Sequence, residues 1–169
     1  MNSFPSGDRT ASLALLPRFL RLRDAPRYLG MDKNRFNADV RPWVPSFRIG
    51  AQGIAFEPGQ TVMQAALAAD RYIPHLCYHP EFKPHGSCKL CTVKVGGWHA
   101  TSCTLPAKAG LVVESQTEEV NAERRMLVQL LFVEGNHFCP SCEMSGHCKL
   151  QATAYDLGMT TPRFDHFVE

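Results

Sequence analysis

Residues 77–91, with the sequence CYHPEFKPHGSCKLC, decide how this chain is built. A first group of four cysteines begins there: Cys77, Cys88, Cys91 and Cys103. A [2Fe–2S] cluster takes four thiolates from a chain that wraps closely around it and directs backbone N–H groups at the sulfurs. Gly86 gives the backbone the freedom to come that close. The spacing therefore predicts a [2Fe–2S] site.

Zinc is the alternative metal for this first group of cysteines. A zinc site of four cysteines usually pairs two short C-x2-C units, and here only Cys88 and Cys91 form one. The expected loop around this group, residues 72–91, also contains His75, His79 and His85. A Rieske centre uses two histidines in place of two cysteines, but four cysteines suffice here. We interpret these histidines as solvated or as neighbours of the ligands.

A second group of cysteines lies in residues 135–148, GNHFCPSCEMSGHC. Its members are Cys139, Cys142 and Cys148. Three thiolates are one ligand short of a closed [4Fe–4S] site, and neutral imidazole suits iron. His137 and His147 are both candidates for the fourth ligand. Zinc bound by three cysteines and one histidine is a stronger alternative here than for the first group.

The bulk composition is that of an ordinary globular protein, with 44% hydrophobic and 20% charged residues. A net charge of +2 gives no argument for nucleic acid or an anionic membrane as partner. No apolar run approaches the roughly 18 residues of a membrane helix, and residues 12–16 are too short for a secretory signal. Seven cysteines would leave one thiol over in a disulfide framework. We therefore expect a cytoplasmic protein whose reduced cysteines carry metal.

The chain is expected to have three parts: an extension (1–45), a [2Fe–2S] domain (46–114) and a helical [4Fe–4S] domain (115–169). In the extension, Arg and Lys outnumber Asp and Glu by four. Its apolar residues allow a short amphipathic helix near residues 10–23. Two interpretations of this extension stay open, a partly disordered arm and an arm that orders on a partner subunit.

The middle part carries strand signals. Alternating apolar residues predict a hairpin that turns at residues 50–53, and Gly96-Gly97 predicts a second, tight turn. Thr61 is a candidate N-cap for a helix through Ala69. The expected strands span residues 47–49, 54–56, 92–95, 98–101 and 111–113.

The last part is predicted to be helical. Ser115 and Glu118 form a capping-box pattern, which predicts a helix to about Val133 that stops at residues 134–136. A final short helix should run from about Cys148 to Leu157. The residues expected on the buried side of the long helix are Val120, Leu127, Leu130 and Leu131.

These motifs resemble the N-terminal part of the large iron–sulfur subunit of respiratory complex I. The resemblance is carried by the cysteine spacing from Cys77 to Cys103, by CPSC at residues 139–142 and by CKLQ at residues 148–151. Similar modules occur in iron-only hydrogenases, NAD-dependent molybdenum formate dehydrogenases and NAD-reducing nickel–iron hydrogenases. The stretch FVEGNHFCPSCE, residues 132–143, looks closest to the diaphorase iron–sulfur subunit of the NAD-reducing hydrogenases.

The resemblance covers about residues 46–160 and implies an α+β fold. A β-grasp ferredoxin domain would be followed by a small helical domain that binds a [4Fe–4S] cluster by three cysteines and one histidine. In complex I that histidine lies four residues before the first cysteine, a position that is Gly135 here. The hydrogenase-type subunits have it two residues before, at His137, so we prefer His137 to His147.

The resemblance also implies partners. FMN and NAD(H) would be held by a diaphorase subunit, and this chain would be a non-catalytic relay of single electrons to a hydrogenase unit or to a formate dehydrogenase. A free-standing two-cluster ferredoxin and a zinc-stabilised interaction module are the rival hypotheses. No G-x-G-x-x-G dinucleotide fingerprint occurs in the sequence. The sequence leaves open the terminal enzyme, the reduction potentials, the direction of electron flow and the role of residues 1–45.

Overall fold

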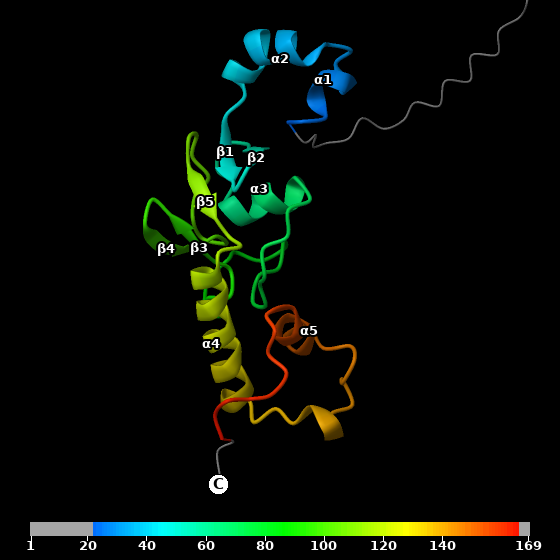
Figure 1. The fold of residues 1–169 in the computed structure, drawn as a ribbon, viewed down its shortest axis with the longest axis vertical. Coiled ribbons are helices and arrows are strands. Elements are labelled where there is room, and N and C mark those ends of the chain that lie inside the picture. Colours follow the sequence, from blue (N-terminus) through cyan, green and yellow to red (C-terminus); the bar gives the residue numbers. More distant parts are fainter. Residues whose placement is uncertain (1–21, 166–169) are drawn as a thin grey trace, which may run out of the picture.

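The computed structural model describes residues 22–165. The described chain is elongated, with two short helices at one end, a sheet in the middle and a helical region at the other end (Figure 1). The predicted helix near residues 10–23 lies almost entirely outside the described residues. None of the described helices has the length and apolar character needed to cross a membrane.

A five-stranded sheet with the order β2-β1-β5-β3-β4 forms the middle of the chain. Two antiparallel hairpins flank the central strand, which pairs in parallel with β1 and antiparallel with β3. Gly50 and the pair Gly96-Gly97 have positive φ values, as tight hairpin turns require. The strands are β1 (Ser46–Ile49), β2 (Gln52–Ala55), β3 (Thr92–Val95), β4 (Trp98–Thr101) and β5 (Val112–Glu114).

Helix α3 (Val62–Ala68) covers one face of this sheet (Figure 1). Thr61 caps it as predicted, in a capping box with Gln64. The first apolar core lies between this helix and the sheet, and its buried members include Phe47, Ile54 and Val113. This mixed architecture confirms the predicted α+β class.

Helix α4 (Glu118–Glu134) follows the last strand of the sheet and is the first helix of the C-terminal region. Its N-cap is Thr117, so the prediction that Ser115 caps it is wrong. Ser115 is buried, and its carbonyl and hydroxyl oxygens accept hydrogen bonds from Arg124 instead. The left-handed residue after the helix is Asn136, with φ 50°, whereas Gly135 keeps a negative φ.

The buried face of α4 also differs from the prediction. Its residues recur about every fourth position along the helix, as one stripe of an α-helix does. Leu130 lies outside this stripe and is 50% exposed, so its predicted burial is wrong, and Leu127 and Leu131 are only half-buried. The buried residues of α4 are Val120, Arg124, Val128, Gln129 and Phe132.

Helix α5 (Lys149–Asp156) packs beside α4 and agrees with the predicted final helix. Cys148 occupies its N-cap position, and Gly158 beyond its end has a positive φ. A second apolar core fills the space between the two helices. Its buried members are Leu90, Val128, Phe132, Ala154, Leu157 and Met159.

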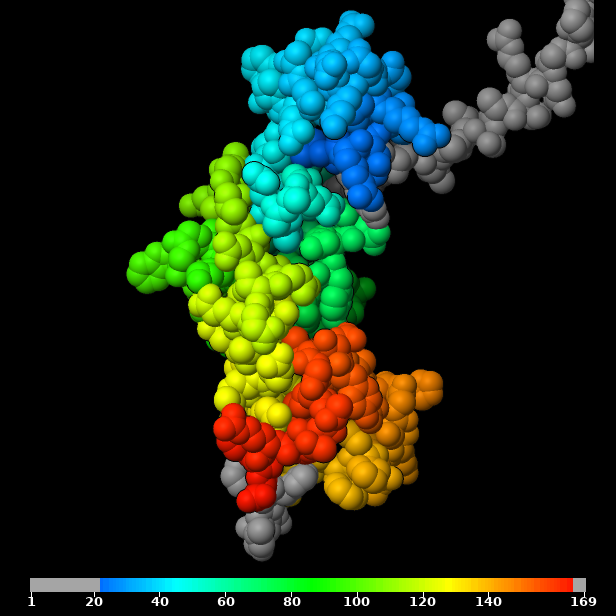
Figure 2. All heavy atoms as spheres, viewed as in Figure 1, coloured from blue at the N-terminus to red at the C-terminus, as the bar shows by residue number. Residues whose placement is uncertain are grey.

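The N-terminal end of the described chain holds elements that we did not predict. They are α1 (Ala25–Tyr28), α2 (Lys33–Asp39) and the 3₁₀ turn η1 (Arg41–Trp43). Asp32 caps α2 by accepting from two backbone N–H groups. In the space-filling view these elements stand at the end of the molecule opposite the second cysteine group (Figure 2).

Candidate iron–sulfur centres

The first cysteine group lies on two loops: the α3–β3 loop carries Cys77, Cys88 and Cys91, and the β4–β5 loop carries Cys103. Cys91 and Cys103 are each 1% exposed, and Cys77 and Cys88 are half-buried. The structure therefore brings two deep and two shallower thiols to one end of the sheet domain.

The four thiols of this group lie close enough to affect one another. Burial, followed by a hydrogen bond with Cys91, raises the pKa of the Cys103 thiol to about 12. The charges of Cys77 and Cys88 act on it in the same direction. Burial also raises the pKa of Cys77, which exchanges hydrogen bonds with Cys88. Four thiols with such mutual effects are a fitting donor set for a group that needs them deprotonated together.

The loop around Cys88 favours the thiolate form of this side chain. Burial raises its pKa, but backbone N–H groups of residues 76, 77 and 90 outweigh burial and leave the pKa below its usual value. N–H groups that point at ligand sulfurs are the contacts that adjust an iron–sulfur potential. Lys89, inside the C-x2-C unit, adopts φ 56°, which curls the backbone there.

Backbone contacts fix the two deep cysteines relative to each other. The carbonyl oxygen of Cys91 accepts from the Ser102 backbone N–H at 3.0 Å and from its hydroxyl at 2.9 Å. Gly86 has a positive φ, and a Cβ added there would lie 3.2 Å from the hydroxyl oxygen of Thr101. The loop thus passes close to β4, where a side chain at residue 86 would not fit easily.

The three histidines near the first cysteine group differ in their burial. His75 is buried, and its Nδ1 lies 2.7 Å from the carbonyl oxygen of Ile73. Its ring meets that of Tyr78 edge-on, with centroids 5.5 Å apart. His79 and His85 are exposed. Burial lowers the pKa of His75, so it is a packed core residue rather than a solvated one.

The second cysteine group lines one small cavity with His137. Cys139, Cys142 and Cys148 contribute their side chains to its wall, and His147 is not among the lining residues. The ring of His137 meets Phe132 edge-on at a centroid distance of 5.9 Å. The structure thus gathers the preferred histidine and the three cysteines, and leaves His147 exposed outside them.

Gln151 holds the loop that carries these cysteines, and we did not single it out as a site residue. Its Oε1 accepts from the Gly146 N–H at 2.8 Å, and its Nε2 donates to the Ser145 hydroxyl at 3.2 Å. Gln151 lies on α5 and is buried. The sequence signal that could have indicated it is its place in the CKLQ motif, in the first turn of α5 and three residues after Cys148.

Gly135 lies directly against the imidazole ring of His137. The backbone N–H of His137 donates to the carbonyl oxygen of Phe132 at 3.0 Å, which folds the chain back at the end of α4. A Cβ built on Gly135 would overlap the His137 ring, whose Cδ2 would be only 2.7 Å away. The imidazole therefore occupies the space that a side chain at residue 135 would take.

A single apolar core connects the two cysteine groups. Cys88 of the first group and Cys139 of the second both pack against the second core, together with Leu76 and Leu150. Leu90, between the ligand candidates Cys88 and Cys91, is fully buried in it. The two groups are thus separated by close-packed side chains.

The donor sets fit iron–sulfur clusters in their chemistry. Four thiols fit a [2Fe–2S] cluster, and three thiols with one imidazole complete four ligands for a [4Fe–4S] cluster. Within residues 22–165, no three His, Cys, Asp or Glu side chains are arranged to hold a single metal ion.

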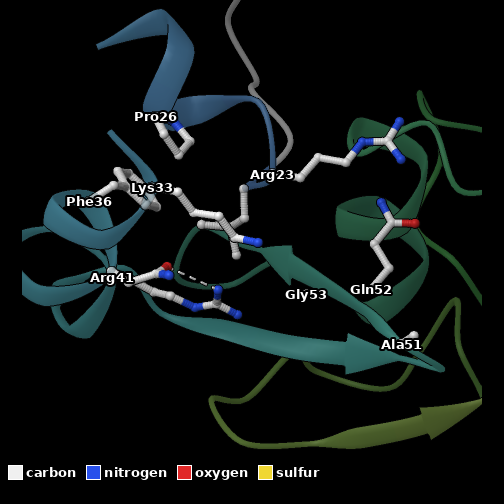
Figure 3. Close-up of a pocket in the computed structure, with 10 residues that line it drawn as sticks. Arg23, Pro26, Lys33, Phe36, Arg41, Ala51, Gln52 and Gly53 are labelled. Carbon is white, nitrogen blue, oxygen red and sulfur yellow. Dashed lines mark hydrogen bonds between the residues drawn. The ribbon is translucent and has the colours of Figure 1, made fainter. Parts of the chain in front are cut away.

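A much larger cavity than the one lined by the second cysteine group lies elsewhere. It has a volume of about 470 Å³ and opens between α2 and the β1–β2 hairpin. Arg23, Lys33 and Arg41 line it, and no cysteine does (Figure 3). It is therefore not a site for either cysteine group.

Two protein families match this chain, one over each region. Residues 46–118 match the 2Fe-2S iron-sulfur cluster binding domain, and residues 124–163 match the NADH-ubiquinone oxidoreductase-G iron-sulfur binding region. The chain is therefore an iron–sulfur protein with a [2Fe–2S] domain followed by a [4Fe–4S] region, as predicted.

Particular relatives confirm the predicted resemblance. The chain is 42% identical over 118 residues to the gamma chain of the NAD-reducing hydrogenase HoxS of Cupriavidus necator, covering 70% of this chain and 50% of that one. It is 34% identical over 118 residues to one of the subunits of the NADH-quinone oxidoreductase of Rickettsia typhi, covering 69% of this chain and 18% of that one.

A solved structure is also similar. The crystal structure of an NAD+-reducing [NiFe]-hydrogenase in the H2-reduced state contains a chain that matches with a TM-score of 0.71 and 55% identity. The match covers 74% of this chain and 53% of that chain. This chain thus spans about half the length of the hydrogenase relatives that it matches.

Proposed function

We propose that this protein is an electron-transfer subunit that relays single electrons between a flavin- and NAD(H)-binding diaphorase subunit and a hydrogenase catalytic unit. The observation that carries the proposal is the apolar core shared by the two cysteine groups. It would hold two clusters at a fixed separation in a packed medium. The names of the hydrogenase relatives favour this assembly over a formate dehydrogenase.

We assign the ligands as follows. The [2Fe–2S] cluster is bound by Cys77, Cys88, Cys91 and Cys103. The [4Fe–4S] cluster is bound by His137, Cys139, Cys142 and Cys148. Imidazole carries no negative charge, so the second site is less anionic than an all-cysteine site and its reduction potential is higher. FMN and NAD belong to the partner, and the complex works in the cytoplasm, where cysteines stay reduced.

We assign residues 22–45 to partner docking. Lys33 and Arg41 reach into the same cavity between α2 and the hairpin (Figure 3), and no carboxylate is among the residues that line it. Arg23 lines it too, but it has an ion-pair partner in Asp24, at 3.7 Å. The occupant that suits this site is an acidic segment of a partner subunit.

The test of the function begins with metal content and spectra. The chain is purified without oxygen, iron and zinc are counted, and the dithionite-reduced sample is examined by low-temperature EPR. About six irons per chain, with one slowly and one rapidly relaxing signal, support the two-cluster relay. Two irons and one zinc would leave a one-cluster carrier, and stoichiometric zinc without iron would leave an interaction module.

A second experiment addresses the assembly. A tagged chain is isolated from its native cells under anaerobic conditions. Co-purification of a flavoprotein, together with reduction of both clusters by NADH, supports the subunit role. A chain recovered alone as a monomer that NADH does not reduce would contradict it and favour a free-standing ferredoxin.

A further inference from the structure

The side chain of Arg124 is the one large charged group in the interior of the described chain. It is 0% exposed and extends from α4 into the sheet domain. A buried guanidinium normally has a carboxylate partner, because a lone charge loses its hydration. Within residues 22–165, none of the ion pairs recorded involves Arg124.

Neutral oxygen atoms surround this guanidinium instead. Nη1 donates to the carbonyl oxygen of Ser115 at 2.6 Å and to Oδ1 of Asn121 at 3.1 Å. Nη2 donates to the hydroxyl of Ser115 at 3.2 Å. All these groups satisfy its hydrogen bonds, but none supplies a negative charge.

The two remaining bonds place Arg124 around Cys91. Nε donates to the carbonyl oxygen of Leu90 at 3.0 Å, and Nη2 donates to that of Thr92 at 2.7 Å. The guanidinium therefore binds the backbone on both sides of Cys91, one of the two deeply buried ligand candidates. Burial lowers the pKa of Arg124 to about 10, and the negative charge of Cys91 acts against this lowering. The side chain thus stays cationic at neutral pH.

We propose that Arg124 is the counter-charge of the [2Fe–2S] cluster and raises its reduction potential. The inference rests on the cluster site proposed above. A [2Fe–2S] cluster on four thiolates is anionic, and one electron makes it more so. A fixed positive charge inside the protein stabilises the reduced form more than the oxidised form, because water screens it little there. Arg124 is also a positioning residue, since its hydrogen bonds to the carbonyl oxygens of Leu90 and Thr92 hold the backbone on both sides of Cys91.

The sharpest test keeps the arginine and cancels its charge. Asn121→Asp is nearly isosteric and places a carboxylate where Arg124 already donates. Ala122→Asp adds the same charge at the next position of α4, where the side chain is exposed and water screens it. Both midpoint potentials are measured in each holoprotein by EPR-monitored redox titration, and the second cluster serves as an internal reference.

At the wild-type midpoint, we expect Asn121→Asp to lower the reduced-to-oxidised ratio of the first cluster about tenfold, which is about 59 mV for one electron. Ala122→Asp and the second cluster should change little. No shift in Asn121→Asp, an equal shift in Ala122→Asp, or loss of the first cluster from Asn121→Asp would overturn the counter-charge role.

A second pair of variants separates charge from structure. Arg124→Lys keeps the charge, and Arg124→Gln removes it, while both lose hydrogen bonds. We expect the first cluster to have a higher potential in Arg124→Lys than in Arg124→Gln. Equal potentials, or loss of the cluster from both, would show a structural role only. Absence of a [2Fe–2S] signal from the wild-type protein is a different result, because it would contradict the proposed site itself.

Discussion

The two cysteine groups offer similar donor atoms for an iron–sulfur cluster but are built differently. The first has its two deepest thiols in the interior of a sheet domain, with backbone bonds that fix Cys91 against Ser102. The second lies on a short loop between two helices, and Cys142 is exposed. The first site therefore depends on tertiary packing, and the second depends on a few local contacts at helix ends.

The largest expected effect is the complete loss of one cluster while the other cluster remains. Cys103→Ala should abolish the [2Fe–2S] signal and remove about two irons per chain while the [4Fe–4S] signal persists. Cys142→Ala is the reciprocal control and should remove only the second cluster. Iron counting and EPR on both variants give the answer. Loss of both clusters from either variant would show that the regions do not load independently.

The next prediction concerns the fourth ligand of the second region. His137 lines the cavity with the three cysteines, and His147 does not. We expect His137→Ala to lose most of the [4Fe–4S] signal and to spare the first cluster. His147→Ala should leave both signals intact. The reverse result would transfer the ligand role to His147.

Gly135→Ala should break the second region without touching a ligand. Its φ of −89° suits any residue, so the backbone does not oppose the change. The new methyl group would overlap the His137 ring and displace it. We expect several-fold less [4Fe–4S] cluster per chain. Gly53→Ala is the matched control, because its Cβ would make only ordinary contacts, at 3.4 and 3.6 Å.

Gln151→Leu should loosen the second region further from the ligands. It removes the acceptor for Gly146 N–H, and one such bond contributes about 1 kcal/mol. The [4Fe–4S] cluster should be lost to an iron chelator a few-fold faster. Gln129→Leu removes a similarly buried bond, to Arg163, and is the control. Equal rates in the two variants would mean that Gln151 only stabilises the fold.

The smallest expected effect lies at the opposite end of the chain. Lys33→Gln with Arg41→Gln should weaken co-purification of the partner a few-fold at low salt, and the difference from the wild type should shrink as salt rises. Both clusters should keep their spectra, because no residue that lines the cavity belongs to either cysteine group. Lys83→Gln with Lys108→Gln is the control for a general loss of charge. An unchanged complex would remove residues 22–45 from the interface.

Much of the fold could be predicted because local chemistry decides it. Gly50 and Gly96-Gly97 mark the hairpin turns, and Thr61 caps its helix, all through contacts between near neighbours in the sequence. The pairing of β5 with β1 and β3 could not be predicted. It joins segments more than 15 residues apart and depends on how the whole domain packs.

The errors on α4 share one physical cause. We placed leucines on the buried face and a serine at the cap, because those are the usual roles of these residues. In the structure the buried stripe contains Arg124, and Ser115 accepts its hydrogen bonds. A charged residue in the interior cannot be recognised from periodicity, since its position depends on carbonyl groups supplied by distant strands and loops.

The sequence alone determined which atoms can bind metal and in which groups, because ligand type and spacing are properties of the chain. It indicated the [2Fe–2S] domain, the [4Fe–4S] region and the order in which they occur, which the family matches confirm. The tertiary structure decided that His137 rather than His147 shares the cavity, that one core connects the two groups, and that Arg124 donates to the carbonyl groups on both sides of Cys91. These are relations across space, and only the packed chain fixes them.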